Sequence, residues 1–146
     1  MTAGQASKLY TPALLSLATE LARFPLSDTF ALSADVRSRT CGSTIELGVS
    51  LDAQSRISDL GMQVTACAIG QASAAILALH VVGIEADEAA GMEQSVDNWL
   101  SSVGPVPQWP GFDALLPALP HSGRQGALML PWKALSLALS KDGIAG

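Results

Sequence analysis

The stretch LGMQVTACAIGQASAAIL, residues 60–77, changes its hydrophobic period at Cys67. Before this cysteine, apolar side chains alternate with small or polar ones, which is typical of a strand with one buried face. After it, apolar positions recur every three or four residues, which is typical of a buried helix. Cys67 is therefore predicted to lie where a strand ends and a helix begins.

Two earlier segments carry the same two-residue period. Apolar residues occupy alternate positions from Phe30 to Val36, and again from Ile45 to Leu51. The polar segment 52–56, DAQSR, has the composition of a hairpin connection between the second and third of these segments. Together the three segments predict an antiparallel meander with one buried face.

Helices are predicted before and after this meander in the sequence. Apolar residues in 10–24 step by four and three along one helical face, and Pro25 is expected to end that helix. Residues 85–104 begin with acids, which suit a helix N-terminus, and Val103 falls on the apolar face of this helix.

The C-terminal third combines a loop and a last helix. Residues 105–120 hold five of the eight prolines and are predicted to form a loop with at most short helical turns. A helix is predicted for roughly residues 124–140. A helix, three strands and then helices predict an α+β fold with the helices on one face of the sheet.

Length and composition restrict the class of protein. With 146 residues, 49% of them apolar, the chain is expected to form one domain, residues 1–146. The net charge of −5 and the absence of a basic run make nucleic acid an unexpected partner. Residues 60–84 are uncharged, but their polar residues and acidic flanks argue against a membrane span. Two cysteines and no signal-peptide pattern predict a cytoplasmic protein with reduced thiols.

The two cysteines are candidate functional residues. Cys41 falls in the turn between the first two predicted strands, and Cys67 at the exit of the third. In a meander both positions can reach the same edge of the sheet, so the two sulfurs can be neighbours. Spacing alone leaves two interpretations open, a shared functional site or two small core residues. His121, before the last helix, is either a ligand or an ordinary solvated loop residue.

The order of these elements resembles the IscU/SufU/NifU N-terminal family of iron–sulfur cluster assembly scaffolds, and its SufU-like branch in particular. That family carries a tyrosine early in its first helix, CGD in the first turn and a cysteine at the start of the next helix. Here Tyr10, CGS at 41–43 and Cys67 occupy those places. SufU-like members continue with R-x-x-C-A-x-L-x-W-K-A-L, and residues 124–135 read RQGALMLPWKAL. The resemblance implies a non-enzymatic role in cluster assembly or sulfur handling, with a cysteine desulfurase as partner.

The resemblance also implies a site of three cysteines and one aspartate that holds zinc or a nascent iron–sulfur cluster. Carried over by position, Cys41 and Cys67 remain, Ser43 replaces the aspartate and Ala127 replaces the third cysteine. His121 is a further candidate ligand. Closed zinc sites and iron–sulfur clusters each use four protein donors. We therefore expect metal to bind more weakly than in a complete scaffold, or not at all.

Two other functions are open from the sequence. A dithiol redox enzyme would use Cys41 and Cys67 as its attacking and resolving thiols. A protein-binding module would keep the fold without a working metal site, with the Pro/Trp-rich loop 105–111 as its contact surface.

Overall fold

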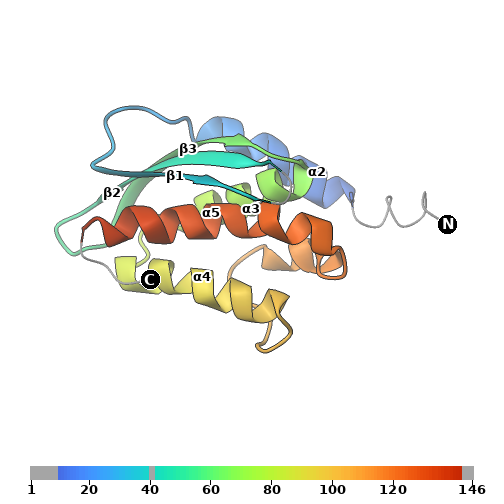
Figure 1. The fold of residues 1–146 in the computed structure, drawn as a ribbon. Helices are drawn as coiled ribbons and strands as arrows, with labels where there is room; N and C mark the ends of the chain where they lie inside the picture. The colour runs from blue at the N-terminus through green and yellow to red at the C-terminus, as the bar shows by residue number, and fades with distance from the viewer. Residues whose placement is uncertain (1–9, 40–41, 143–146) are drawn as a thin grey trace.

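The computed structural model of the chain describes residues 10–39 and 42–142. Helical segments precede and follow one three-stranded sheet, which confirms the predicted α+β fold (Figure 1). None of the helices in this described part combines the length and the apolar character needed to cross a bilayer. The elements are α2 (Pro12–Thr19), the 3-10 helix η1 (Glu20–Arg23), β1 (Leu32–Arg37), β2 (Thr44–Leu51), β3 (Ile57–Thr65), α3 (Ala68–His80), α4 (Ala86–Leu100), the 3-10 helix η2 (Phe112–Ala118) and α5 (Ser122–Ser140).

The sheet is the predicted meander. Its strand order is β1–β2–β3, and both neighbouring pairs are antiparallel. Ala34 pairs with Leu47, which pairs with Met62, and all three side chains are buried. Since side chains alternate between the two faces of a strand, this register places the apolar residues of all three strands on one inner face.

Two long helices cover that inner face. Both α3 and α5 contact the sheet and each other, while α4 packs against α5 and α2 packs against α3 (Figure 1). Aromatic side chains fill the space beneath α3, where the rings of Trp109 and Trp132 meet edge to face with centroids 5.3 Å apart. Trp99, Trp109 and Trp132 are all buried, so all three tryptophans belong to the core.

Two details of the predicted helices are wrong. The single helix predicted for residues 10–24 is α2 followed by η1, so its regular part ends at Thr19. The Thr19 hydroxyl donates to the Ser16 carbonyl at 2.7 Å, a local bond that competes with regular helix geometry. Val103 was predicted to face inward, but α4 ends at Leu100 and the Val103 side chain is 74% exposed.

Phe30 also departs from the predicted pattern. It precedes β1 and lies on the outer face of the sheet, over two paired glycines, Gly48 on β2 and Gly61 on β3. A Cβ on Gly48 would lie 2.5 Å from Cδ2 of Phe30 and 2.8 Å from its Cβ. A Cβ on Gly61 would lie only 2.2 Å from the Pro25 carbonyl oxygen. Only glycines allow the segment from Pro25 to Phe30 to lie this close to the sheet.

Replacing Gly48 by alanine is expected to lower the free energy of unfolding by about 1–3 kcal/mol, because Phe30 would have to move away from the sheet. Urea denaturation followed by circular dichroism measures this change. Gly91→Ala on α4 is the matched control, since a Cβ there meets nothing within 4 Å and alanine favours a helix. Equal stability of Gly48→Ala and the unmodified protein would contradict the packing described for Phe30.

Candidate functional site

Cys67 lies at the predicted junction. Strand β3 ends at Thr65 and α3 begins at Ala68, so Cys67 is the residue that caps the helix. Its backbone is extended (φ −66°, ψ 173°), and its carbonyl accepts the first helical hydrogen bond from the Gln71 N–H at 3.0 Å. The thiol is partly buried and makes no hydrogen bond that caps the helix. The change of hydrophobic period therefore located this residue correctly.

Ser43 lies at the same end of the sheet. It directly precedes β2, whose first residue Thr44 pairs with Thr65, the last residue of β3. Ser43 is buried, and its carbonyl accepts a hydrogen bond from the Ser38 N–H at 2.8 Å. The pairing of β2 with β3 thus brings Ser43 and Cys67 to the same end of the sheet. Cys41 lies outside the described residues, so its predicted proximity to Cys67 stays a prediction.

Ala127 completes this corner of the fold from the helical layer. It is fully buried on α5 and faces Gly70, which lies three residues after Cys67 on α3. A Cβ on Gly70 would lie 3.2 Å from the Ala127 Cβ and 3.3 Å from the Ala127 carbonyl oxygen. The first turn of α3 therefore packs directly on Ala127. We call Ser43, Cys67 and Ala127, three positions at which the family resemblance implies ligands, the ligand corner.

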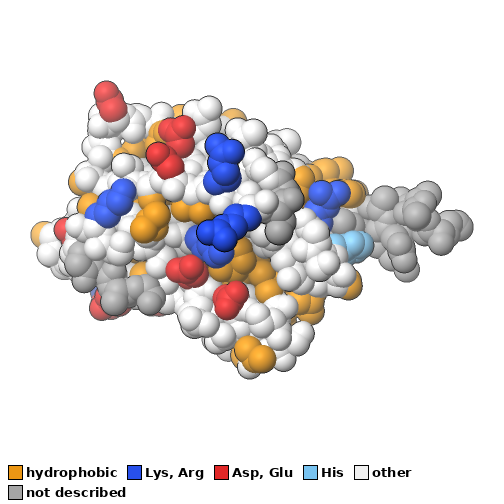
Figure 2. Space-filling view, in the orientation of Figure 1, with side chains coloured by type: hydrophobic (Ala, Val, Ile, Leu, Met, Phe, Trp, Pro, Cys, Tyr) orange, Lys and Arg blue, Asp and Glu red, His pale blue; other side chains and the backbone are white. Residues whose placement is uncertain are grey.

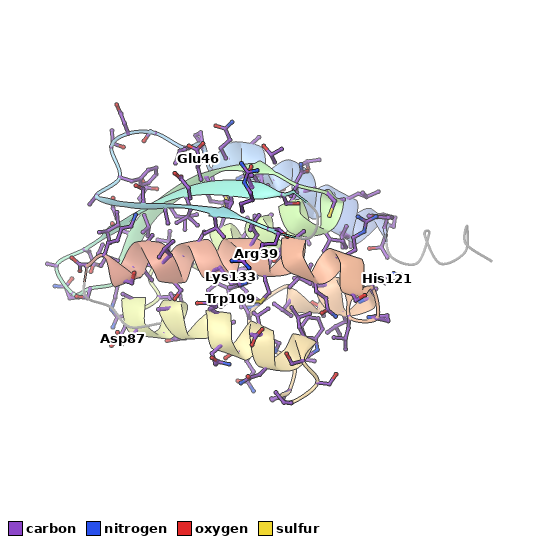
Figure 3. The ribbon with its side chains drawn as sticks, viewed as in Figure 1. Arg39, Glu46, Asp87, Trp109, His121 and Lys133 are labelled. Carbon is purple, nitrogen blue, oxygen red and sulfur yellow. The ribbon has the colours of Figure 1, made fainter. Side chains whose placement is uncertain are left out.

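His121 lies apart from Ala127 along α5. It caps the N-terminus of that helix and is half-buried, six residues before Ala127 and therefore roughly 9 Å away along the helix axis (Figure 3). Within residues 10–39 and 42–142, no three His, Cys, Asp or Glu side chains gather closely enough to hold one metal ion. The structure thus supplies no contact that joins His121 to the ligand corner.

A buried hydrogen-bond relay, which the sequence did not reveal, holds α3 against α5 beside the ligand corner. The Ser73 hydroxyl on α3 donates to the Leu128 carbonyl at 2.7 Å and accepts from the Trp132 indole N–H at 2.9 Å. Ser73 is fully buried. The periodicity placed Ser73 on the inner face of its helix, but its partners lie more than fifty residues later and only the fold brings them together.

The structure also brings together three basic residues that the sequence left dispersed. Arg37 and Arg39, at the end of β1, line a depression of about 260 Å³ together with Lys133 of α5. Figure 3 shows Arg39 and Lys133 next to one another above α5. The sequence contains no basic run, and only the fold brings these three residues together. The two-residue spacing of the arginines was visible in the sequence, but the position of Lys133 was not.

Comparison with known proteins agrees with this architecture. Residues 23–109 match the family described as the NifU-like N terminal domain. The N-terminal structure of a nitrogen-fixing NifU-like protein from Brucella abortus has a TM-score of 0.84 at 25% identity, covering 94% of this chain and 96% of that one. A protein from the thermophile Fervidobacterium islandicum AW-1, described as a candidate iron–sulfur cluster assembly scaffold for the SUF system, has a TM-score of 0.81 at 20% identity. That match covers 91% of this chain and 98% of the other. None of the curated proteins matches the chain.

Replacing Ser73 by alanine is expected to destabilise the protein by about 1–3 kcal/mol, because the buried Trp132 indole N–H would lose its acceptor. Thermal and urea denaturation measure the loss, and a change in the tryptophan fluorescence, to which Trp99 and Trp109 also contribute, reports the altered surroundings of the Trp132 ring. Ser95→Ala on the exposed face of α4 is the control and should stay within about 0.5 kcal/mol of the unmodified protein. Equal losses in the two variants would argue against the relay.

Proposed function

Because the chain belongs to the NifU-like N-terminal domain family, we propose that it is a diverged iron–sulfur cluster assembly scaffold-like protein. We assign it to the SufU-like branch, and it acts in the cytoplasm in cluster assembly or sulfur handling. It is not an enzyme and works by binding partner proteins, with a cysteine desulfurase as the expected partner. The observation that carries this proposal is the ligand corner, where Ser43, Cys67 and Ala127 meet in a family-like fold.

The donors at the ligand corner do not fit a complete metal or cluster site. Cys67 offers a thiolate, Ser43 offers a neutral hydroxyl and Ala127 offers only a methyl group. Cys41 would raise the number of thiols to two, which is still short of the four donors of a closed zinc site or a stable cluster. We therefore infer that a metal ion or a nascent cluster, as cargo, is held weakly here.

The alanine at position 127 also affects sulfur transfer. A persulfide forms when an acceptor thiolate attacks the outer sulfur of a donor cysteine persulfide and the donor cysteine leaves as a thiolate. The methyl group of Ala127 therefore cannot receive sulfur at the position where the family resemblance places a receiving cysteine. The core around the position is nevertheless intact, with Ala127 fully buried against Gly70. This combination favours a protein that keeps the family surface for partners while its own sulfur-accepting and cluster-holding capacity is reduced.

Restoring the missing donors tests the proposal. Reduced wild-type protein titrated with zinc is expected to form no one-to-one complex that survives gel filtration. The double variant Ser43→Asp/Ala127→Cys is expected to form one, because it supplies a carboxylate and a third thiolate beside Cys67 and Cys41. Zinc should also raise the melting temperature of the double variant more than that of the wild type, since binding to the folded state stabilises it.

Two controls make this test specific. Ala127→Ser has nearly the size of the cysteine variant without its thiolate, and it should not gain tight zinc binding. Adding Cys67→Ser to the double variant should abolish the gain. A stable stoichiometric zinc complex of the wild type would refute the proposal of a weak site, and failure of the folded double variant to bind zinc would refute the assignment of positions 43 and 127.

A dithiol redox enzyme is the second candidate, favoured by the position of Cys67 as the residue that caps α3. Such an enzyme would form a reversible disulfide between Cys41 and Cys67. Mass spectrometry after mild oxidation, with and without reductant, distinguishes the two functions. The alternative of a binding module that uses loop 105–111 is weaker, because Trp109 is buried and its indole N–H donates to the Ile76 carbonyl at 2.9 Å.

A further inference from the structure

One side of the molecule carries a groove along α5, bounded first by the end of β1 and then by Glu93 of α4. The depression of about 260 Å³ at Arg37, Arg39 and Lys133 is followed by a second one of about 360 Å³, and the two share Val36 and Lys133. Their floor is one stripe of α5, with residues spaced by four and three along the helix: Gly126, Leu130, Lys133, Leu137 and Ser140. Leu137 is 45% exposed at the surface of this stripe. The groove is thus elongated and partly apolar, which suits an extended chain better than a compact ion.

The upper wall of the groove is the free edge of a strand. Within the part of the chain that the structure describes, strand β1 pairs only with β2. The Ser38 N–H donates to the Ser43 carbonyl, which lies on the side of β2. Along β1, the backbone groups of even-numbered residues therefore face β2, and those of odd-numbered residues face away from the sheet. Lys141 accordingly donates to the outward Ser33 carbonyl. The outward backbone groups of Asp35 and Arg37 make no hydrogen bond to any residue that the structure describes, which leaves this part of the edge open to another strand.

Charge gives this open edge a preference for one kind of partner. Figure 2 shows basic side chains meeting in the middle of this face, with acidic groups above and below them. Among the described residues, the two ion pairs are Arg23–Glu20 and Arg56–Glu85, and neither uses a cation of the groove. Glu93 lines the opposite end of the groove. In the described part of the chain, the depression at Arg37, Arg39 and Lys133 has no acidic side chain in its lining, whereas Asp35 and Glu46 line a neighbouring depression with Arg37.

We propose that this groove binds an extended acidic segment of another protein, which adds to the sheet as a fourth strand beside β1. Main-chain hydrogen bonds to Asp35 and Arg37 hold the segment, as in other cases of strand addition. Its carboxylates meet Arg37, Arg39 and Lys133, since guanidinium groups match carboxylates in geometry as well as charge. The intervening apolar side chains cover Leu137, which is 45% exposed. The ligand corner is not needed for this interaction, which is independent of the proposed function.

A fluorescein-labelled peptide of alternating glutamate and valine, titrated with the full chain and followed by fluorescence anisotropy, tests the proposal. We expect binding that weakens as salt is added. Arg37→Glu/Arg39→Glu should reduce the affinity at least about tenfold, a loss that about 1.4 kcal/mol would produce. The matched control Arg23→Glu/Arg56→Glu changes the net charge equally on other elements and should change the affinity less than about twofold. In NMR spectra, the peptide should shift the amide signals of Asp35 and Arg37.

Four further tests separate strand addition from other modes of binding. A peptide of the same sequence with N-methylated valines keeps the charges but loses alternate main-chain donors, and it should bind at least about tenfold more weakly. Equal binding of that peptide, or of one that alternates lysine and valine, would overturn the proposal. So would displacement of the acidic peptide by millimolar inorganic phosphate, which indicates a small-anion site. Dimerisation of the free protein through this edge in analytical ultracentrifugation would also overturn it, by assigning the groove to a second copy.

Discussion

The buried hydroxyl of Ser73 connects the two helices on which the inner layer depends. A serine inside an apolar helix is costly unless both its donor and its acceptor are used, and here the Leu128 carbonyl and the Trp132 indole use both. Because a hydrogen bond has a narrow range of lengths and angles, this relay fixes the rotation and the height of α5 relative to α3. Apolar packing alone allows one helix to shift slightly along the other, whereas the two hydrogen bonds of Ser73 do not.

That fixed relation between helices determines the geometry of the ligand corner. Cys67 begins α3, and Ala127 lies one residue before the carbonyl to which Ser73 donates. Gly70 allows the two helices to approach until Ala127 lies against the first turn of α3. The residues that hold the two helices together are therefore different from the residues that could donate to a metal. A continuous apolar core holds the corner in shape, unlike small zinc domains in which metal binding supplies the folding energy.

The sequence predicted those features that depend on local pattern. The strands were predictable because one face of each is buried, so their apolar residues alternate; the start of α3 was predictable because the hydrophobic period changes there. The end of α2, the exposure of Val103 and the position of Phe30 were not predictable, because each depends on a local hydrogen bond, a helix end or a crossing segment. The groove beside β1 was missed for a different reason, since Arg37 and Lys133 are 96 positions apart in the sequence and only the fold brings them together.

The two edges of the sheet are unequal. Along β3, the Met62 N–H donates to the Phe24 carbonyl at 2.9 Å and the Ile57 N–H donates to the Ile84 carbonyl at 2.9 Å, so chain segments already occupy this edge. The segment that ends at Phe30 is held there because Gly48 and Gly61 leave room for it on the outer face. An assembly that grows strand by strand requires two open edges on every molecule, and here crossing segments interrupt the β3 edge at Ile57 and Met62. By leaving room for the segment that ends at Phe30, the glycine pair makes strand addition less favourable at β3 than at β1.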